Sequence, residues 1–217
     1  KDWILISNID IEFSTDVISL LVQKALEYPM SQMGALCLSH NVAISSGVQI
    51  KSWVMTSHFH PFAGTSKVNI PNDLCVRVNL LATRCMLIPV EAVAKSGLVA
   101  ERLLPHYGAD MEFSHRLCKS GYVPYIYTGA CINVDTSNTG QSIYNKESKL
   151  LDRILSLMSI RNLSNPWYRT ILVLLIYPWY AWPTAISAYL LRTLIETLLS
   201  KNQIKLYFGH EGRGYPG

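Results

Sequence analysis

The apolar residues of this chain gather into short runs separated by stretches with helical spacing. Trp3–Ser7 is an apolar run of strand length, and it ends in the more polar stretch Asn8-Ile9-Asp10. This is the pattern of a buried parallel strand. Residues 15–28 repeat apolar positions at helical spacing, and residues 34–40 form a second run of strand length. The alternation predicts an α/β fold with a sheet flanked by helices.

Two further helices and several extended segments are predicted in the middle of the chain. Val90–Ser96 should form a short helix that ends at Gly97. Residues 110–120 have acidic side chains at the start and basic ones at the end, as the helix dipole favours. Extended structure is expected over residues 42–49, 76–89, 123–127 and 130–134.

The C-terminal part carries a long stretch without charge. Residues 170–191 contain no charged side chain, and their length could cross a bilayer core, which needs about 20 apolar residues. Pro178, Pro183 and the aromatic residues around them argue against one straight span. Three interpretations stay open: a helical hairpin in the membrane interface, a true span, or a buried helix pair in a soluble protein.

Composition and charge narrow the class of protein. Of the 217 residues, 49% are hydrophobic and 16% charged, which excludes intrinsic disorder for the bulk of the chain. A net charge of +4 is too small for a basic stripe, so we expect no nucleic-acid partner. The five cysteines are widely spaced, without a CxxC motif, and we expect free buried thiols rather than a zinc site.

The first candidate site follows the first strand. Asn8-Ile9-Asp10 would lie at the carboxyl end of a strand, where open α/β sheets bind ligands. The Asp10 carboxylate could hold a hard divalent cation that also contacts a diphosphate. The alternative is an aspartate that only caps the next turn.

The second candidate site opens the helix at residues 110–120. Asp110 could act as a general base that takes a proton from an attacking hydroxyl, or it could be an ordinary carboxylate at a helix start. Glu112 lies on another side of that helix and is spaced to pair with Arg116.

Two other groups of residues have candidate chemistry. Arg84 could bind substrate or pair with a carboxylate such as Asp110. His58 and His60 could bind a metal ion, but the pattern offers no third ligand.

Taken in order, these segments resemble the family 2 glycosyltransferases of the GT-A type, in particular their bacterial rhamnosyltransferase-like branch. The resemblance runs from Trp3 to about Gly140. The stretch WILISNIDIEF resembles the strand that ends in the family's Asp-x-Asp-like metal motif, here Asn8-Ile9-Asp10.

The stretch from LATRCM to KSGY resembles the acceptor half of the family. Asp110 falls on the aspartate of the Glu-Asp motif, and Arg116 falls on one of the residues that usually follow it. The sequence departs from the family at Ala109, where an acidic residue is frequent, and at Thr83, where glycine is common. The family often has a histidine after the next strand. This sequence has no histidine there, and Asn133 or Asp135 lies near that position.

The resemblance implies transfer of a sugar, with inversion, from a nucleotide-diphospho-sugar to a hydroxyl of a glycan or lipid-linked acceptor in cell-envelope polysaccharide synthesis. Asp110 would be the catalytic base, and Asp10 would bind a divalent cation, Mg²⁺ or Mn²⁺. The residues expected to bind the donor phosphate or the acceptor are Asn8, Arg84, Tyr107, Glu112 and Arg116.

The resemblance also implies an order of domains. Residues 1–150 would form a partial GT-A domain, a mixed sheet flanked by helices, and we expect its nucleotide-binding part upstream of Lys1. Residues 151–208 would form a hydrophobic helical segment at the cytoplasmic face of a membrane, and residues 209–217 a flexible tail. The alternative function is a non-catalytic, membrane-anchored module that binds glycans, or a degenerate transferase.

Overall fold

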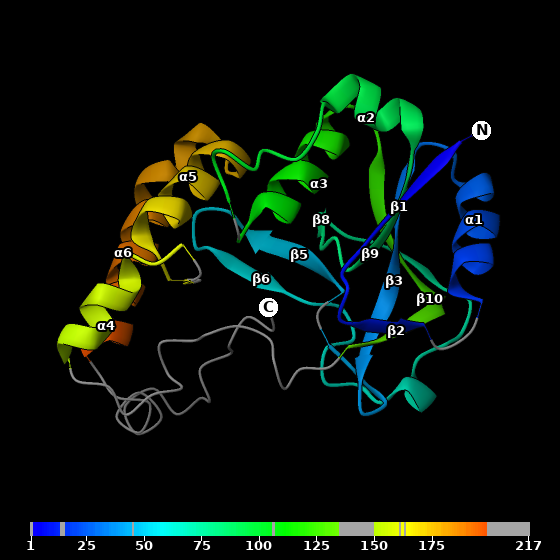
Figure 1. The fold of residues 1–217 in the computed structure, drawn as a ribbon, viewed down its shortest axis with the longest axis horizontal. Coiled ribbons are helices and arrows are strands. Elements are labelled where there is room, and N and C mark those ends of the chain that lie inside the picture. The colour runs from blue at the N-terminus through cyan, green and yellow to red at the C-terminus, as the bar shows by residue number, and fades with distance from the viewer. Residues whose placement is uncertain are drawn as a thin grey trace. The chain divides into compact units, whose positions relative to one another are not determined.

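The structure is a computed structural model, drawn as a ribbon in Figure 1. It describes residues 2–13, 16–44, 46–105, 107–134, 150–160, 162 and 164–198. The expected tail at residues 209–217 and the candidate residue Asp135 lie outside this described part.

The chain forms two compact units. The first unit comprises Lys1–Lys51, His58–Val99 and Asp110–Asn138, and the second comprises Ser52–Ser57, Ala100–Ala109 and Thr139–Gly217. The helical segment expected at residues 151–208 falls within the second unit, which also takes in residues 52–57, 100–109 and 139–150 from the range expected for the first domain.

The first unit is built on a mixed sheet, as the predicted α/β class requires. Its main strand order is β1 (Trp3–Ser7), β9 (Cys85–Pro89), β3 (Ser31–Ser39), β10 (Val123–Val134) and β2 (Ile11–Phe13), with β4 (Val42–Ala43) beside β3 and β7 (Cys75–Arg77) beside β10. β9 runs antiparallel to both β1 and β3, and β10 runs parallel to β3. β1, β3 and β10 therefore point the same way, and their carboxyl ends meet at one edge of the sheet.

The prediction of a buried parallel first strand was wrong in two respects. β1 pairs antiparallel with β9, and its side chains are half-buried rather than buried. Ile4 and Ile6 pack on one face of the sheet and Trp3 and Leu5 on the other. Both faces of β1 contact the core, which explains its continuous apolar pattern, but the pattern carries no information on strand direction.

Helices cover both faces of this sheet. α1 (Val17–Glu27) packs on one face, and α2 (Val90–Ser96) and α3 (Ala109–Lys119) pack on the other (Figure 1). β3 alternates accordingly, because Leu36 contacts the core under α3 and Cys37 contacts the core under α1. The result is a three-layer arrangement with the sheet in the middle.

Two helix ends follow the sequence closely. α2 has the predicted bounds and ends at Gly97, whose φ is 75°. After α3, Gly121 has a φ of 96°, and the Tyr122 N–H donates to the carbonyl oxygen of Leu117 (3.1 Å). Both glycines have a positive φ that other residues rarely adopt.

A smaller sheet and a 3₁₀ turn complete the first half of the chain. β6 (Ser57–Phe59), β5 (Gly47–Ser52) and β8 (Leu80–Leu81) form a three-stranded sheet in that order, and η1 (Lys67–Asn69) is a 3₁₀ turn. The extended segment expected at residues 76–89 is thus divided among parts of β7, β8 and β9.

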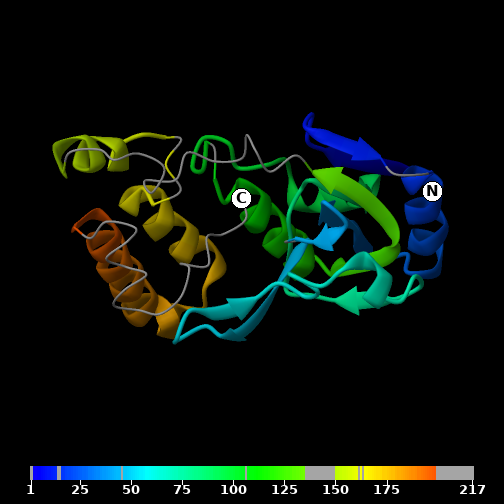
Figure 2. The same cartoon turned by 90° about the horizontal axis from the view of Figure 1, so that it is seen from below.

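The described part of the second unit contains three helices and a 3₁₀ turn: α4 (Leu150–Leu157), α5 (Pro166–Ile176), η3 (Trp179–Ala181) and α6 (Trp182–Leu198). α5 ends before Pro178, as the prolines predicted, and α5 and α6 lie side by side (Figures 1 and 2). The Trp182 indole N–H donates to the carbonyl oxygen of Tyr177 (2.9 Å), which fixes the break between them. None of the helices in the described ranges combines the length and apolar character that crossing a membrane requires.

Candidate functional site

The first candidate residues lie at the carboxyl edge of the large sheet. β1 ends at Ser7, and the backbone N–H of Asn8 donates to the carbonyl oxygen of Arg84 (3.1 Å), which extends the pairing of β1 with the start of β9. The chain turns at Ile9 and Asp10 and returns as β2, which pairs with β10. Asp10 is therefore an exposed carboxylate held between two strands at this edge.

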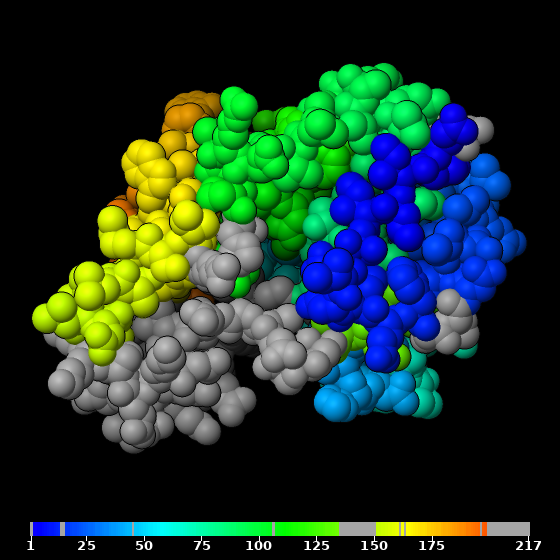
Figure 3. Space-filling model, viewed as in Figure 1, coloured from blue at the N-terminus to red at the C-terminus, as the bar shows by residue number. Residues whose placement is uncertain are grey.

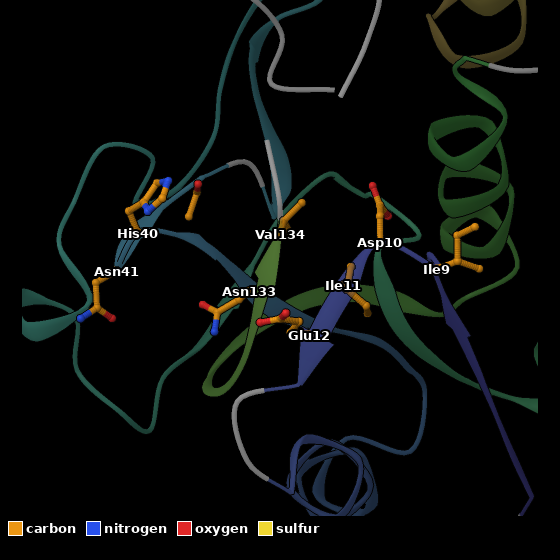
Figure 4. Close-up of a pocket in the computed structure, with 9 residues that line it drawn as sticks. Ile9, Asp10, Ile11, Glu12, His40, Asn41, Asn133 and Val134 are labelled. Carbon is orange, nitrogen blue, oxygen red and sulfur yellow. The ribbon is translucent and has the colours of Figure 1, made fainter. Parts of the chain in front are cut away.

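A pocket of about 930 Å³ opens beside Asp10 (Figure 4). Its walls are the link between β1 and β2, the turn after β3 and the end of β10, and its polar lining includes Asp10, Glu12, His40, Asn41 and Asn133. The carboxyl edge of parallel strands is where open α/β sheets bind ligands. The turn that carries His40 and Asn41 has positive φ at both residues, 48° and 64°, a conformation that histidine and asparagine adopt more often than most other non-glycine residues.

The donor atoms around Asp10 fit one kind of cation site. Glu12 lies opposite Asn133 in the β2–β10 register, and Figure 4 shows its carboxylate turned towards that residue while the Asp10 carboxylate points elsewhere. Within the described residues, no three His, Cys, Asp or Glu side chains gather as a complete metal site. Mg²⁺ often binds through one or two carboxylates, several waters and a substrate phosphate. Asp10 offers one exposed carboxylate of this type in an open pocket.

Asp110 lies in the first turn of α3 and is half-buried. The Met111 backbone N–H donates to Oδ1 of Asp110 (2.8 Å), and the Thr83 backbone also hydrogen-bonds to this carboxyl. Burial raises the pKa of Asp110 and outweighs these bonds and the nearby Arg84 charge, which act to lower it. A carboxylate with a raised pKa is a stronger base than an ordinary aspartate.

Arg84 lies near Asp110 and pairs through its backbone with Asn8. Its side chain is buried, hydrogen-bonds to the Cys37 thiol and lies close enough to Asp110 to influence its titration. The Arg84 carbonyl accepts the Asn8 N–H, while the neighbouring Thr83 hydrogen-bonds to Asp110. The structure thus brings Asn8, Arg84 and Asp110 to one end of β9, with Asp10 two residues beyond Asn8.

Glu112 and Arg116 form the ion pair that their spacing predicted. Arg116 Nε donates to Glu112 Oε1 and Nη2 donates to Oε2, both at 2.9 Å. The guanidinium also donates to the backbone carbonyls of Ser96, the last residue of α2, and of Leu98, two residues further on. These bonds give the pair a structural role in fixing α3 to the α2 end, and its expected role in ligand binding stays a prediction.

Tyr107 belongs to the second unit, so the structure does not place it relative to the edge that carries Asp110. It is half-buried. Its expected contact with donor or acceptor also stays a prediction.

The histidines on and after β6 are arranged differently from a metal site. His60 Nδ1 lies 2.8 Å from the Gly47 carbonyl oxygen, so that nitrogen carries the proton and donates. Burial lowers the pKa of His60. The His58 ring is 6.1 Å from the His60 ring in an edge-to-face arrangement, and among the described residues no third ligand joins them.

All five cysteines are free thiols, as the sequence predicted. Cys37, Cys85 and Cys131 are buried, and burial raises the pKa of Cys85 to about 12. Thiols with raised pKa values are poor nucleophiles at neutral pH, so these side chains act as small core residues.

A buried polar network behind α3 was not predicted from the sequence. Gln32 on β3 donates from Nε2 to the carbonyl oxygens of Ser114 and Tyr122, both at 2.8 Å. The Ser114 hydroxyl donates to Gln32 Oε1 (2.7 Å) and accepts the Leu81 N–H (2.8 Å). Ser114 is one turn beyond Asp110, so the network fixes the rotation of α3. The only indication of this network in the sequence is Gln32, a single polar residue at the start of the apolar run of β3.

Comparisons with known proteins do not add a family. A scan against protein-family models gave no match, and a search of curated proteins found no significant relative. A function is therefore inferred from this chain's own residues and from the resemblance of its motifs to those of a known family.

Proposed function

We propose that the first unit serves an inverting glycosyltransferase, which moves a sugar from a nucleotide-diphospho-sugar to an acceptor hydroxyl. The observation that carries the proposal is the shared edge: Asp110 hydrogen-bonds to Thr83, and the adjacent Arg84 pairs with Asn8, two residues before Asp10 and its pocket. A mixed sheet covered by helices on both faces is compatible with the GT-A fold that the motifs suggest.

The proposed reaction is one direct displacement. The acceptor hydroxyl oxygen attacks the anomeric carbon, and Asp110 takes the hydroxyl proton as that bond forms. The bond from the anomeric carbon to the diphosphate oxygen breaks, and the nucleoside diphosphate leaves with its electron pair. Attack from the opposite side of the carbon inverts its configuration. Burial makes Asp110 a stronger base, while Arg84 and the backbone N–H groups favour its ionised form.

The pocket beside Asp10 supplies the binding side of the proposal. Asp10 would hold a divalent cation, Mg²⁺ or Mn²⁺, which when bound neutralises negative charge on the diphosphate. Asn8 and the pocket residues His40 and Asn41 offer polar groups for phosphate or sugar oxygens. These residues all lie at the edge where β1, β3 and β9 meet.

The test is the rate of sugar transfer by Asp110→Asn. Amide nitrogen and oxygen cannot accept the hydroxyl proton, so we expect a loss of roughly 10²- to 10⁴-fold in turnover with an unchanged circular dichroism spectrum. The matched control is Asp2→Asn, which removes an exposed carboxylate at the other end of β1 and should leave turnover unchanged.

Undiminished turnover in Asp110→Asn would exclude it as the base. A protein that binds nucleotide-diphospho-sugar but never transfers the sugar would favour the alternative function, a binding module without catalysis.

A further inference from the structure

The second unit presents an apolar stripe that faces outward on α4 and the turn directly after it. Leu151, Ile154, Leu155 and Met158 are spaced i, i+3, i+4 and i+7, and they are between 50% and 78% exposed. This spacing places them on one side of a helix. The other side faces α6, because Arg153 Nη1 donates to the carbonyl oxygen of Thr197 (3.4 Å). In Figure 3, α4 (yellow-green) lies at the surface.

A second stripe lies on α6, the helix that α4 packs against. Its members are leucines between 46% and 58% exposed, namely Leu190, Leu191, Leu194 and Leu198. Thr193 and Thr197 are buried on another side of α6, where the Thr193 hydroxyl donates to the Ser164 carbonyl oxygen (3.5 Å). α6 therefore uses its threonines for internal contacts and leaves its leucines exposed.

Aromatic side chains are also exposed in this unit. Trp167 in the first turn of α5 is 68% exposed, and Trp179 in η3 is 75% exposed. Tyr180 beside it is also exposed. Tryptophan and tyrosine concentrate at membrane–water interfaces, because their rings are apolar and each carries one polar group.

The segment from α4 to α6 carries a net positive charge. Residues 150–198 contain four arginines, Arg153, Arg161, Arg169 and Arg192, against two acidic residues, Asp152 and Glu196, which gives a net charge of +2. Positive charge beside exposed leucine and tryptophan complements anionic lipid headgroups over an acyl interior. The same surface on a second copy of the chain would bring like charges together.

We propose that α4 and α6 lie in the surface of an anionic lipid bilayer. The two apolar stripes enter the boundary between headgroups and acyl chains, and the net positive charge of the segment attracts the anionic headgroups. This role concerns where the protein acts, and it holds whether or not the first unit transfers a sugar.

The experiment is co-sedimentation of the purified protein with lipid vesicles. We expect binding to vesicles of phosphatidylcholine mixed with phosphatidylglycerol, weaker binding to phosphatidylcholine alone, and a decrease at high salt. The double variant Leu155→Glu and Leu194→Glu removes one leucine from each stripe, so we expect its binding to fall by at least about tenfold. The milder pair Leu155→Gln and Leu194→Gln should lose less.

The matched control is the double variant Leu26→Glu and Val68→Glu. It adds two negative charges at exposed apolar positions of the first unit, and it should bind vesicles within about twofold of the unchanged protein. Equal losses in the control and the stripe variant would overturn the proposal, because charge alone would then explain them. So would absent vesicle binding, or a dimer in light scattering that the stripe variant dissociates, since the stripes would then join two copies.

Discussion

Asp110 combines two properties at the level of a single residue. Burial opposes its ionised form, and the backbone N–H groups of Met111 and Thr83, together with the Arg84 charge, favour that form. Its raised pKa shows that burial has the larger effect. Strongly perturbed pKa values are frequent at active sites, which is consistent with the base role proposed for Asp110.

This balance predicts how Asp110→Asn changes stability with pH. Because the pKa of Asp110 is raised in the folded state, its protonated form stabilises the fold below the unfolded-state pKa of about 3.9, and that contribution is lost as pH rises through the folded-state pKa. The asparagine side chain that replaces Asp110 carries no charge at any pH. We therefore expect a higher Tm than the unchanged protein at pH 7 and equal Tm values under acidic conditions.

Thermal unfolding followed by circular dichroism from acidic to neutral pH measures this difference. Asp2→Asn is again the control and should give parallel curves, since that residue is exposed. A Tm for Asp110→Asn that is lower at pH 7 would mean that the carboxylate is stabilising in place, contrary to the raised pKa.

At the scale of elements, the position of α3 depends on contacts far away in the chain. The Ser114 hydroxyl bonds to Gln32, which is 82 residues away, and accepts the Leu81 N–H. On another side of the same helix, the ion pair of Glu112 and Arg116 connects α3 to the α2 end. Together these contacts hold the helix start that carries Asp110.

Ser114→Ala tests the buried network. The substitution leaves the Leu81 N–H and Gln32 Oε1 without these partners in the core, and we expect it to cost about 1–3 kcal/mol of unfolding free energy. Urea unfolding measures the cost. Ser19→Ala on the exposed side of α1 is the control and should stay within about 0.5 kcal/mol of the unchanged protein. Equal small changes in both variants would mean that the network does not hold α3.

The sequence predicted the bounds of helices and strands better than it predicted which strands pair and in which direction. The bounds of β1 and α2 were correct, and α3 is displaced by only one residue. The two strands expected at residues 123–127 and 130–134 are one strand, β10, with a shift in register between Tyr127 and Cys131. Strand direction and continuity depend on which partner lies alongside, and the apolar pattern does not contain that information.

The same distinction applies to the candidate site. The Glu112–Arg116 pair follows from a spacing of four on a helix, so local pattern was sufficient. The pairing of Gln32 with Ser114 depends on the packing of β3 against α3, so no local sequence pattern predicts it.

At the scale of the whole molecule, the candidate site of the first unit is assembled from separate parts of the chain. Its segments are the stretch after β1, the start of β9 and the start of α3. The sequence predicts the candidate residues of each segment. The antiparallel pairing of β1 with β9 brings the first two segments side by side. The second unit carries its own surface of exposed leucine and tryptophan.

Asp10 and Asp110 are proposed to serve one reaction in different roles. This assignment of roles is tested most directly by measuring, in Asp10→Asn and Asp110→Asn, both Mn²⁺-dependent binding of nucleotide-diphospho-sugars and the rate of sugar transfer. We predict that Asp10→Asn weakens binding, while Asp110→Asn binds the donor as the unchanged protein does and loses transfer. Normal transfer by Asp110→Asn, or normal Mn²⁺-dependent binding by Asp10→Asn, would contradict the account.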